Sequence, residues 1–230
     1  MFNKNVNPTM KENENREQAI LRAAEREFLA RGYDGTKTTA IAEAAGVTHA
    51  LLHYYFRTKE KLYERVFDDI VSRLETSLVE AFSANGLPFM TRLEEGLRRH
   101  FLYLLDHPDL PRFLINEFTA HPERAAALRL RFGVMLGRVL ASLQADMEAQ
   151  AAEGTIARMN LTDLLYDAVA LNAFSFLSYP LAGMLLAPGT DARAYHLARL
   201  EENLIVIRKR LQPDPPCENA SSSCSPDWLP

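Results

Sequence analysis

The sequence contains little cysteine, and none of it lies in the body of the chain. Two cysteines occur in 230 residues, Cys217 and Cys224, and both follow Gln212 in a tail rich in proline and serine. A disulfide framework needs cysteines distributed through the fold, so we expect a cytoplasmic protein in a reducing compartment. The same placement excludes a cysteine nucleophile from a folded active site.

Long apolar runs are also missing. The first 17 residues, MFNKNVNPTMKENENRE, lack the apolar segment of a signal peptide. Residues 168–190 carry no formal charge, but Asn172, Pro180 and Gly183 interrupt their apolar character. Because a membrane-spanning helix needs about 20 predominantly apolar residues, we expect no membrane span and interpret this segment as a buried interface helix.

Strand patterns and catalytic motifs are absent as well. No segment alternates apolar and polar residues between turn signals, and neither a glycine-rich phosphate loop nor a serine elbow occurs. His100, His107 and His121 lie near acidic residues, but their spacing does not place two ligands four residues apart on one helix. We therefore expect no enzyme, no metal site and no cofactor.

Charge is unevenly distributed along the chain. The net charge is −4, yet residues 1–65 contain 11 Lys/Arg and 9 Asp/Glu, whereas the remainder contains 15 and 21. A slightly basic head on an acidic body indicates that the two parts have different partners.

What the sequence does contain is helical periodicity along most of its length. Apolar residues recur at intervals of three and four, and glycine- or proline-containing turn sequences separate the runs. The expected helices cover residues 17–32, 38–45, 48–56, 59–83, 89–106, 110–120, 124–152, 161–187 (bent or split at Pro180) and 191–211. The predicted fold is therefore all-α, with about nine helices. The polar ends at 1–14 and 212–230 are predicted to be disordered from their composition.

Residues 38–56 form a pattern of two short helices joined at Gly46. Two helices that cross steeply would bury apolar residues between them, here Ile41, Ala45, Val47, Leu52 and Tyr55. Ala42 is small enough for a close approach, and Gly46 can adopt a left-handed turn. This is the helix-turn-helix pattern, whose second helix enters the major groove of DNA. Any helical hairpin buries apolar residues, so the pattern alone leaves a plain hairpin open.

A longer stretch, AILRAAEREFLARGYDGTKTTAIAEAAGVTHALLHYYFRTKEKLYERVF, closely resembles the N-terminal domain of the TetR/AcrR family of transcriptional repressors. The matching residues are Ala23, Ala24, Phe28, Gly32, Tyr33, Thr36, Ile41, Ala42, Ala45, Gly46, Val47, Leu52, Tyr55, Phe56, Lys59, Glu60 and Leu62. The rest of the chain resembles the family only in its number of helices and in the sequence HPDLPRF. The resemblance implies a DNA-binding domain at 15–62 and an effector-binding and dimerisation domain at 63–211.

The resemblance further implies a ligand-responsive repressor that binds a palindromic double-stranded DNA operator as a homodimer. Carried over position by position, the DNA contacts would come from Thr38, Thr39, Thr48, His49, Ala50, Leu51, His53, Tyr54 and Lys59. Family members often have Lys-Gly-Thr-Leu-Tyr where this chain has residues 49–53 as His-Ala-Leu-Leu-His. The operator sequence is therefore not implied, and Leu51 fits either a thymine methyl contact or plain packing.

The effector domain is rich in aromatic residues, most of which are expected in its core. A pocket between helices would use a subset, and an apolar or amphipathic small molecule is the expected effector. The candidate lining is His100, Phe101, Phe113, Asn116, Glu117, Phe132, Met135, Asn172 and Phe176. If Glu117 faces inward, it favours a cationic ligand.

The resemblance also implies how two chains would pair. Residues 161–179 and 191–210 are predicted to form a four-helix bundle across a two-fold axis. The alternative interpretation is a membrane-associated or adaptor helical protein without DNA binding, and it rests on residues 168–190 alone. The sequence identifies neither the effector nor the regulated genes.

Overall fold

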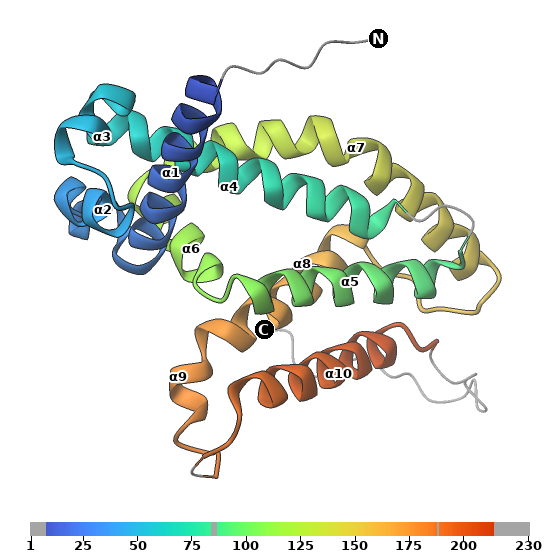
Figure 1. Cartoon of the computed structure of the whole chain (residues 1–230). Coiled ribbons are helices and arrows are strands. Elements are labelled where there is room, and N and C mark those ends of the chain that lie inside the picture. Colours follow the sequence, from blue (N-terminus) through green and yellow to red (C-terminus); the bar gives the residue numbers. More distant parts are fainter. Residues whose placement is uncertain (1–7, 84–86, 188, 214–230) are drawn as a thin grey trace, which may run out of the picture.

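The computed structural model describes residues 8–83, 87–187 and 189–213, and within them every regular element is a helix (Figure 1). The helices are α1 (Pro8–Gly35), α2 (Thr38–Ala44), α3 (His49–Phe56), α4 (Lys59–Phe82), α5 (Phe89–Asp106), α6 (Leu110–Ala120), α7 (Pro122–Ala152), α8 (Leu161–Leu177), α9 (Tyr179–Ala182) and α10 (Ala192–Arg210). The all-α prediction is confirmed. The number of helices in these residues is ten, or eleven if α1 is divided at its kink, rather than about nine.

The extra helix arises at Pro180. The predicted helix over 161–187 ends at Leu177, and the four-residue α9 follows with Pro180 in its first turn. Proline has no N–H to donate to the preceding turn, but it is tolerated at the start of a helix, where that N–H needs no partner. Of the two predicted alternatives, a bend or a split near Pro180, the structure shows a split into two helices.

The N-terminal arm predicted over 1–14 is wrong for its second half. Helix α1 begins at Pro8 and includes residues 8–14, while residues 1–7 lie outside the described part. The many asparagines suggested disorder, but the Tyr55 hydroxyl of α3 donates to Asn13 at its main-chain and side-chain oxygens, at 3.3 and 3.2 Å. A tertiary contact thus extends the helix. From residue 214 onward, the predicted tail also lies outside the described residues.

Helix α1 turns sharply at Gly32 to reach α2. Gly32 has φ 69° and ψ −179°, a conformation that only glycine adopts at low cost. The buried Thr36 hydroxyl donates to the carbonyls of Gly32 and Glu27, at 2.8 and 3.0 Å, and so fixes the turn. The kink directs the chain from the long helix into the short pair α2 and α3.

In Figure 1, α1, α2 and α3 gather at one end of the molecule, and α4 runs from this end along the body. Helix α4 packs against α5 and α7, while α10 packs against α5 and α8 on the other side of α5. The interior of the body is tightly filled, since a Cβ added at Gly96 would lie 2.2 Å from the Phe82 ring. The helix pair therefore lies at one end of the molecule, joined to the body by α4.

Candidate nucleic-acid interface

Helices α2 and α3 are joined by a short turn that fixes their crossing. Gly46 has φ 67°, and the Val47 N–H donates to the Ala42 carbonyl at 3.0 Å. Thr48 is the N-cap of α3, where its hydroxyl accepts the Leu51 N–H at 3.2 Å. The buried contacts between the two helices and α1 come from Ile41, Ala42, Leu52 and Phe56. The sequence pattern of a helix-turn-helix thus corresponds to a packed helix pair.

The adjacent rings of α3 face in different directions. Phe56 is 8% exposed and lies in the core, whereas Tyr54 is 68% exposed. Tyr55 is half-buried at the edge of the core and donates to Asn13. The run of aromatic residues therefore serves two surfaces, one that packs against α1 and one that faces outward with Tyr54.

His53 belongs to a connected polar chain on the outer face of α3. Its Nδ1 lies 3.0 Å from the Arg57 carbonyl oxygen, and its Nε2 lies 3.2 Å from Nε2 of His49. The same nitrogen of His49 lies 2.9 Å from the Thr38 hydroxyl of α2. Three of the predicted contact residues are therefore held together before any DNA is present.

The other predicted contact residues lie around this chain. Thr39, Thr48 and Ala50 are exposed. Leu51 is half-buried in a groove between α1 and α3, beside Arg22 of α1. The structure therefore brings Thr38, His49 and His53 together, leaves Thr39, Thr48 and Ala50 exposed and leaves Leu51 half-buried.

Lys59 begins α4, where Thr58 is the N-cap and accepts the Lys61 N–H at 3.2 Å. The Lys59 ammonium lies 4.3 Å from the centre of the Tyr33 ring, so a cation–π contact orients it. The Tyr33 hydroxyl donates to Glu60. This hydrogen bond is the largest cause of the rise in the pKa of Tyr33 to about 12, and it lowers the pKa of Glu60.

Sequence reasoning missed Arg57, in the turn between α3 and α4. It is the one described non-glycine residue with a positive φ, 58°, and its guanidinium carbon lies 6.0 Å from the centre of the Tyr54 ring. A strained backbone of this kind persists where its surroundings hold it. The signal available in the sequence was a basic residue placed directly between the recognition helix and Lys59.

The predicted effector residues fall into two separate groups. In the first, buried Glu117 of α6 accepts hydrogen bonds from the Tyr63 hydroxyl of α4 and from Arg124 of α7. Phe113 lies 6.3 Å from the Tyr63 ring, and burial raises the pKa of Tyr63 to about 12. Because Arg124 already neutralises Glu117, the geometry does not support the expected preference for a cationic ligand. Exposed Asn116 borders a neighbouring hollow between α1 and α6.

The second group is a buried polar chain between α5, α8 and α10. The Asn172 amide donates to the Leu97 carbonyl at 3.0 Å and lies 3.2 Å from Nδ1 of His100. Asn203 in turn donates to Asn172 at 3.1 Å. Burial lowers the pKa of His100 to about 4. These side chains satisfy one another and join three helices, as buried polar groups must.

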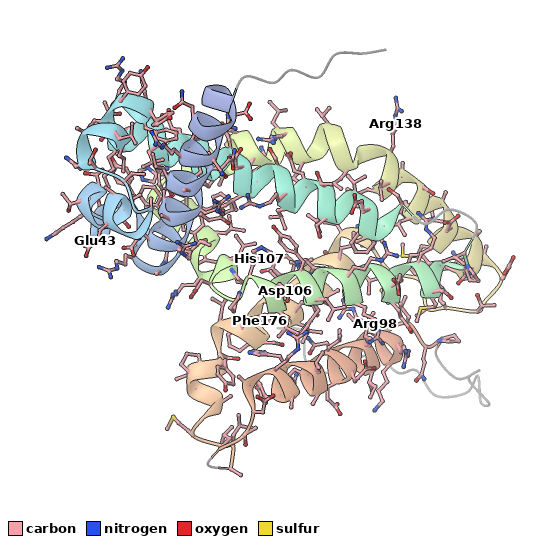
Figure 2. The ribbon with its side chains drawn as sticks, viewed as in Figure 1. Glu43, Arg98, Asp106, His107, Arg138 and Phe176 are labelled. Carbon is pink, nitrogen blue, oxygen red and sulfur yellow. The ribbon has the colours of Figure 1, made fainter. Side chains whose placement is uncertain are left out.

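Aromatic packing completes this second group. The Phe176 ring lies 5.0 Å from Phe101 and 4.4 Å from His196, between α8 and α10 (Figure 2). Phe132 is half-buried on α7, and the side chain of Met135 lies outside the described part of the structure. The eight predicted lining residues whose side chains are described therefore do not form one pocket.

The structure also contains two hollows that were not predicted from the sequence. One, of about 300 Å³, lies between α4 and α7 and is lined by Tyr63, Glu64, Phe67, Asp68, Val71, Arg124, Ala127, Leu128 and Arg131. The other, of about 520 Å³, lies along α8 and α10 and includes Phe174, Tyr195 and Val206. Each hollow is lined by residues far apart in the sequence, so no local sequence pattern predicts it.

Helices α8 and α10 expose an apolar strip. Phe174 is 62% exposed and Val206 45%, and Tyr166, Val169 and Leu197 are also exposed. Phe174 and Val206 both line the hollow along these helices, and exposed apolar side chains that lie together on a surface are typical of an interaction site. Among the helices described, none has the length and apolar character needed to cross a membrane. The described residues also contain no group of three or more His, Cys, Asp or Glu side chains arranged to hold a metal ion.

The comparisons with known proteins agree with this geometry. A family model described as bacterial regulatory proteins of the tetR family matches residues 20–66, which span α1 to the beginning of α4. The regulator RutR of Escherichia coli K12 is 33% identical over 105 residues, which cover 46% of this chain and 49% of RutR. The chain thus matches only about half the length of RutR.

Other relatives extend the likeness along the chain. The uncharacterized HTH-type transcriptional regulator YdgC of Bacillus subtilis is 26% identical over 155 residues, covering 64% of this chain and 80% of YdgC. A TetR family regulator from Marinobacter aquaeolei VT8 has a TM-score of 0.62 at 20% identity over 89% of this chain and 99% of the other. HlyIIR, a hemolysin II transcriptional regulator, has a TM-score of 0.55 at 22% identity, covering 81% and 97%.

The two solved structures are too distant in sequence to show more than a common fold, whereas the family model identifies the helix-turn-helix segment. The named relatives are transcriptional regulators. Residues 20–66 therefore match the tetR family of bacterial regulatory proteins, and most of the chain shares its fold with a solved TetR family regulator.

Proposed function

We propose that this protein is a cytoplasmic, ligand-responsive transcriptional repressor that binds a palindromic DNA operator as a homodimer. One observation supports this above the others. Helix α3 is held by buried Leu52 and Phe56 while it presents Thr48, Ala50 and Tyr54 on its exposed face. A recognition helix needs such a rigid back and a solvent-facing front to reach base edges in the major groove.

The proposed division of labour follows the helices. Residues 15–62 read the operator, and residues 63–211 bind the effector and the second chain. Thr38, Thr39, His53 and Lys59 would hold the phosphate backbone, which sets register and orientation. The exposed strip on α8 and α10 would be covered by the same strip of the partner, because a two-fold axis pairs identical surfaces.

The hollow between α4 and α7 is the proposed effector site. Its apolar side chains, Phe67, Val71 and Leu128, suit a small hydrophobic or amphipathic molecule. Tyr63 lines it and also contacts the head, with ring centres 4.9 Å from Phe28 and 5.1 Å from Tyr33. A ligand that displaces Tyr63 or tilts α4 would therefore move α1 and the helix pair.

The switch has a simple energetic requirement. Two recognition helices reach successive major grooves only when they lie about 34–36 Å apart, or a little more. A ligand releases the operator only if it binds more tightly to a conformation in which α4 is tilted differently. Each tenfold difference in the ligand's affinity for the two conformations shifts the equilibrium between them by about 1.4 kcal/mol. The proposed direction is release of the operator.

A gel-shift experiment with the DNA upstream of the protein's own gene tests the proposal. At low salt, where phosphate contacts are strongest, we expect a retarded complex for the native chain. Ala50→Glu should abolish it, because a carboxylate on the exposed face of α3 would oppose DNA. Ala126→Glu, at an exposed position of α7, is the matched control and should bind normally. If the native chain gives no complex, the helical adaptor without DNA binding becomes the better interpretation; if both variants bind DNA alike, α3 is not the recognition helix.

A further inference from the structure

The histidine pair on α3 has a geometry that DNA contact does not require. His49 and His53 are four residues apart, so their side chains lie on one face of the helix. Their Nε2 atoms are 3.2 Å apart, and the ring planes are nearly perpendicular, at 87°. The two nitrogens therefore lie close enough together at the surface to be bridged by one ion.

The other ring nitrogen of His53, Nδ1, already has a hydrogen-bond partner. A carbonyl oxygen can only accept, so Nδ1 of His53 carries the hydrogen that is donated to Arg57 at 3.0 Å. In the neutral ring, Nε2 then carries the lone pair. Histidines that bind metals in proteins have this arrangement as a rule, with the other ring N–H donated to a carbonyl or carboxylate. The accepting carbonyl belongs to Arg57, the C-cap residue of α3, whose φ is 58°.

The distance between the nitrogens also fits a metal ion. Two imidazole nitrogens bound to tetrahedral Zn²⁺ at 2.0–2.1 Å lie about 3.3 Å apart. The Thr38 hydroxyl, 2.9 Å from Nε2 of His49, brings an oxygen from α2 to the same place. It is positioned to hydrogen-bond a water on the ion.

We propose that His49 and His53 bind a divalent transition-metal ion of the class that prefers imidazole, such as Zn²⁺ or Ni²⁺. The two Nε2 atoms are the protein ligands, the Thr38 hydroxyl orients a bound water, and the remaining positions are open. The sequence reasoning missed this site because it weighed only the histidines of the body. Metal binding itself does not depend on the proposed function.

The consequence for DNA does rest on the proposed function. A divalent ion on the outer face of α3 adds two positive charges where the operator phosphates would approach, and bound cations are often the largest local charges in a site. Operator affinity should therefore rise with the ion bound. Without an ion, Nε2 of His49 donates its hydrogen to Nε2 of His53, and the two rings interact only through this hydrogen bond.

Calorimetric titration of the full chain with ZnCl₂ tests the site. The protein carries no affinity tag, is stripped with a chelator, and has Cys217→Ser and Cys224→Ser so that thiolates do not compete. We expect one ion per chain. His49→Gln and His53→Gln should each weaken binding by at least about tenfold, because two ligands become one.

His107→Gln is the matched control. Its Nδ1 also lies 2.9 Å from a main-chain carbonyl, that of Tyr103, but its ring stacks on that tyrosine instead of facing a second imidazole. This variant should bind Zn²⁺ like the parent. The proposal is overturned if the parent binds no Zn²⁺, or if all three variants bind it equally. A parent that binds Zn²⁺ but gives no gel shift with or without it would support the site and contradict the DNA-binding function.

Discussion

At the scale of single residues, the buried polar side chains of the body act as structure rather than as ligand anchors. His100, Asn172 and Asn203 form one hydrogen-bonded chain across three helices. Each would cost free energy if it were buried alone, and each finds its partner in another helix. A sequence shows that such residues are polar and lie on apolar faces, but their partners are 72 and 31 residues away.

The lowered pKa of His100 predicts a pH dependence of stability. Its folded pKa is about 4, below the ordinary value of 6.5, so the unfolded chain binds a proton more readily. The stability from neutral His100 is therefore complete above pH 6.5 and is lost as the pH falls toward 4. Between pH 7 and pH 5 the loss should be about 2 kcal/mol in the free energy of unfolding.

Urea unfolding of the native chain and of His100→Gln at the two pH values measures this loss. The native chain should lose about 2 kcal/mol more than the variant. His107→Gln removes a half-buried histidine of the same helix end and should behave like the native chain. Equal losses for the native chain and His100→Gln would show that His100 contributes nothing to the pH dependence.

At the scale of helices, periodicity and turn signals predicted most boundaries. Helices α5 and α6 occupy 89–106 and 110–120, as the proline-containing breaks around them indicated. Thr48 and Thr58 cap α3 and α4 by a local rule that needs no tertiary information. The early start of α1 differs because it depends on Tyr55, which is 42 residues away from Asn13.

The candidate site divides in the same way. Residues 38–59 were predictable because the helix-turn-helix is a local motif. Its helix caps, its turn and its buried positions all depend on residues within a stretch of some twenty. The effector residues were not, since a pocket depends on how helices far apart in the sequence pack. The contact of Arg124 with Glu117, which removes the expected cation preference, is of this second kind.

Two glycines in helices should respond to alanine in opposite ways. Gly96 of α5 faces the Phe82 ring of α4, where a Cβ would lie 2.2 Å from a ring carbon. Gly96→Ala should therefore destabilise the protein by about 1–3 kcal/mol through overpacking. Gly133 of α7 has open space around it, so Gly133→Ala should stabilise by about 0.5–1 kcal/mol through helix propensity.

Thermal and urea unfolding of the two variants measure these effects. The two substitutions add the same methyl group, so any difference comes from its surroundings. A Gly96→Ala protein as stable as the native chain would show that Phe82 can move aside freely and that α4 and α5 are less tightly coupled than their packing indicates.

At the scale of the whole molecule, the apolar strip on α8 and α10 predicts the oligomeric state. The native chain should have the mass of two 26.0 kDa chains in light scattering at micromolar concentration. Phe174→Glu together with Val206→Glu should give monomers, because a buried carboxylate without a partner is costly. Val134→Glu, at an 81% exposed apolar position of α7, should remain dimeric.

A monomeric native chain would contradict the proposed use of this strip. Loss of the dimer in Val134→Glu as well would instead place the interface on α7, where Leu130 and Val134 are also exposed. The three chains therefore locate the interface and establish whether it exists.

Aromatic contacts help to join the head and the body. Tyr63 packs against Phe28 and Tyr33 on α1 and bonds to Glu117 on α6, so the start of α4 touches both parts. Figure 1 shows α4 running from the head along the body. In the proposed function, this helix would therefore transmit a movement at the effector site to the DNA-binding helices. Under the proposed function, the separation of the two recognition helices in the dimer would decide whether DNA is bound.

Hydroxyl-radical footprinting on the DNA upstream of the gene tests this central claim most directly. For a dimer with two α3 helices, we predict two protected half-sites related by two-fold symmetry, with centres about one helical turn apart or slightly more. Protection should disappear in Ala50→Glu and weaken steeply as salt rises. An absence of protection at low salt, or a single unsymmetrical patch unaffected by Ala50→Glu, would contradict the account.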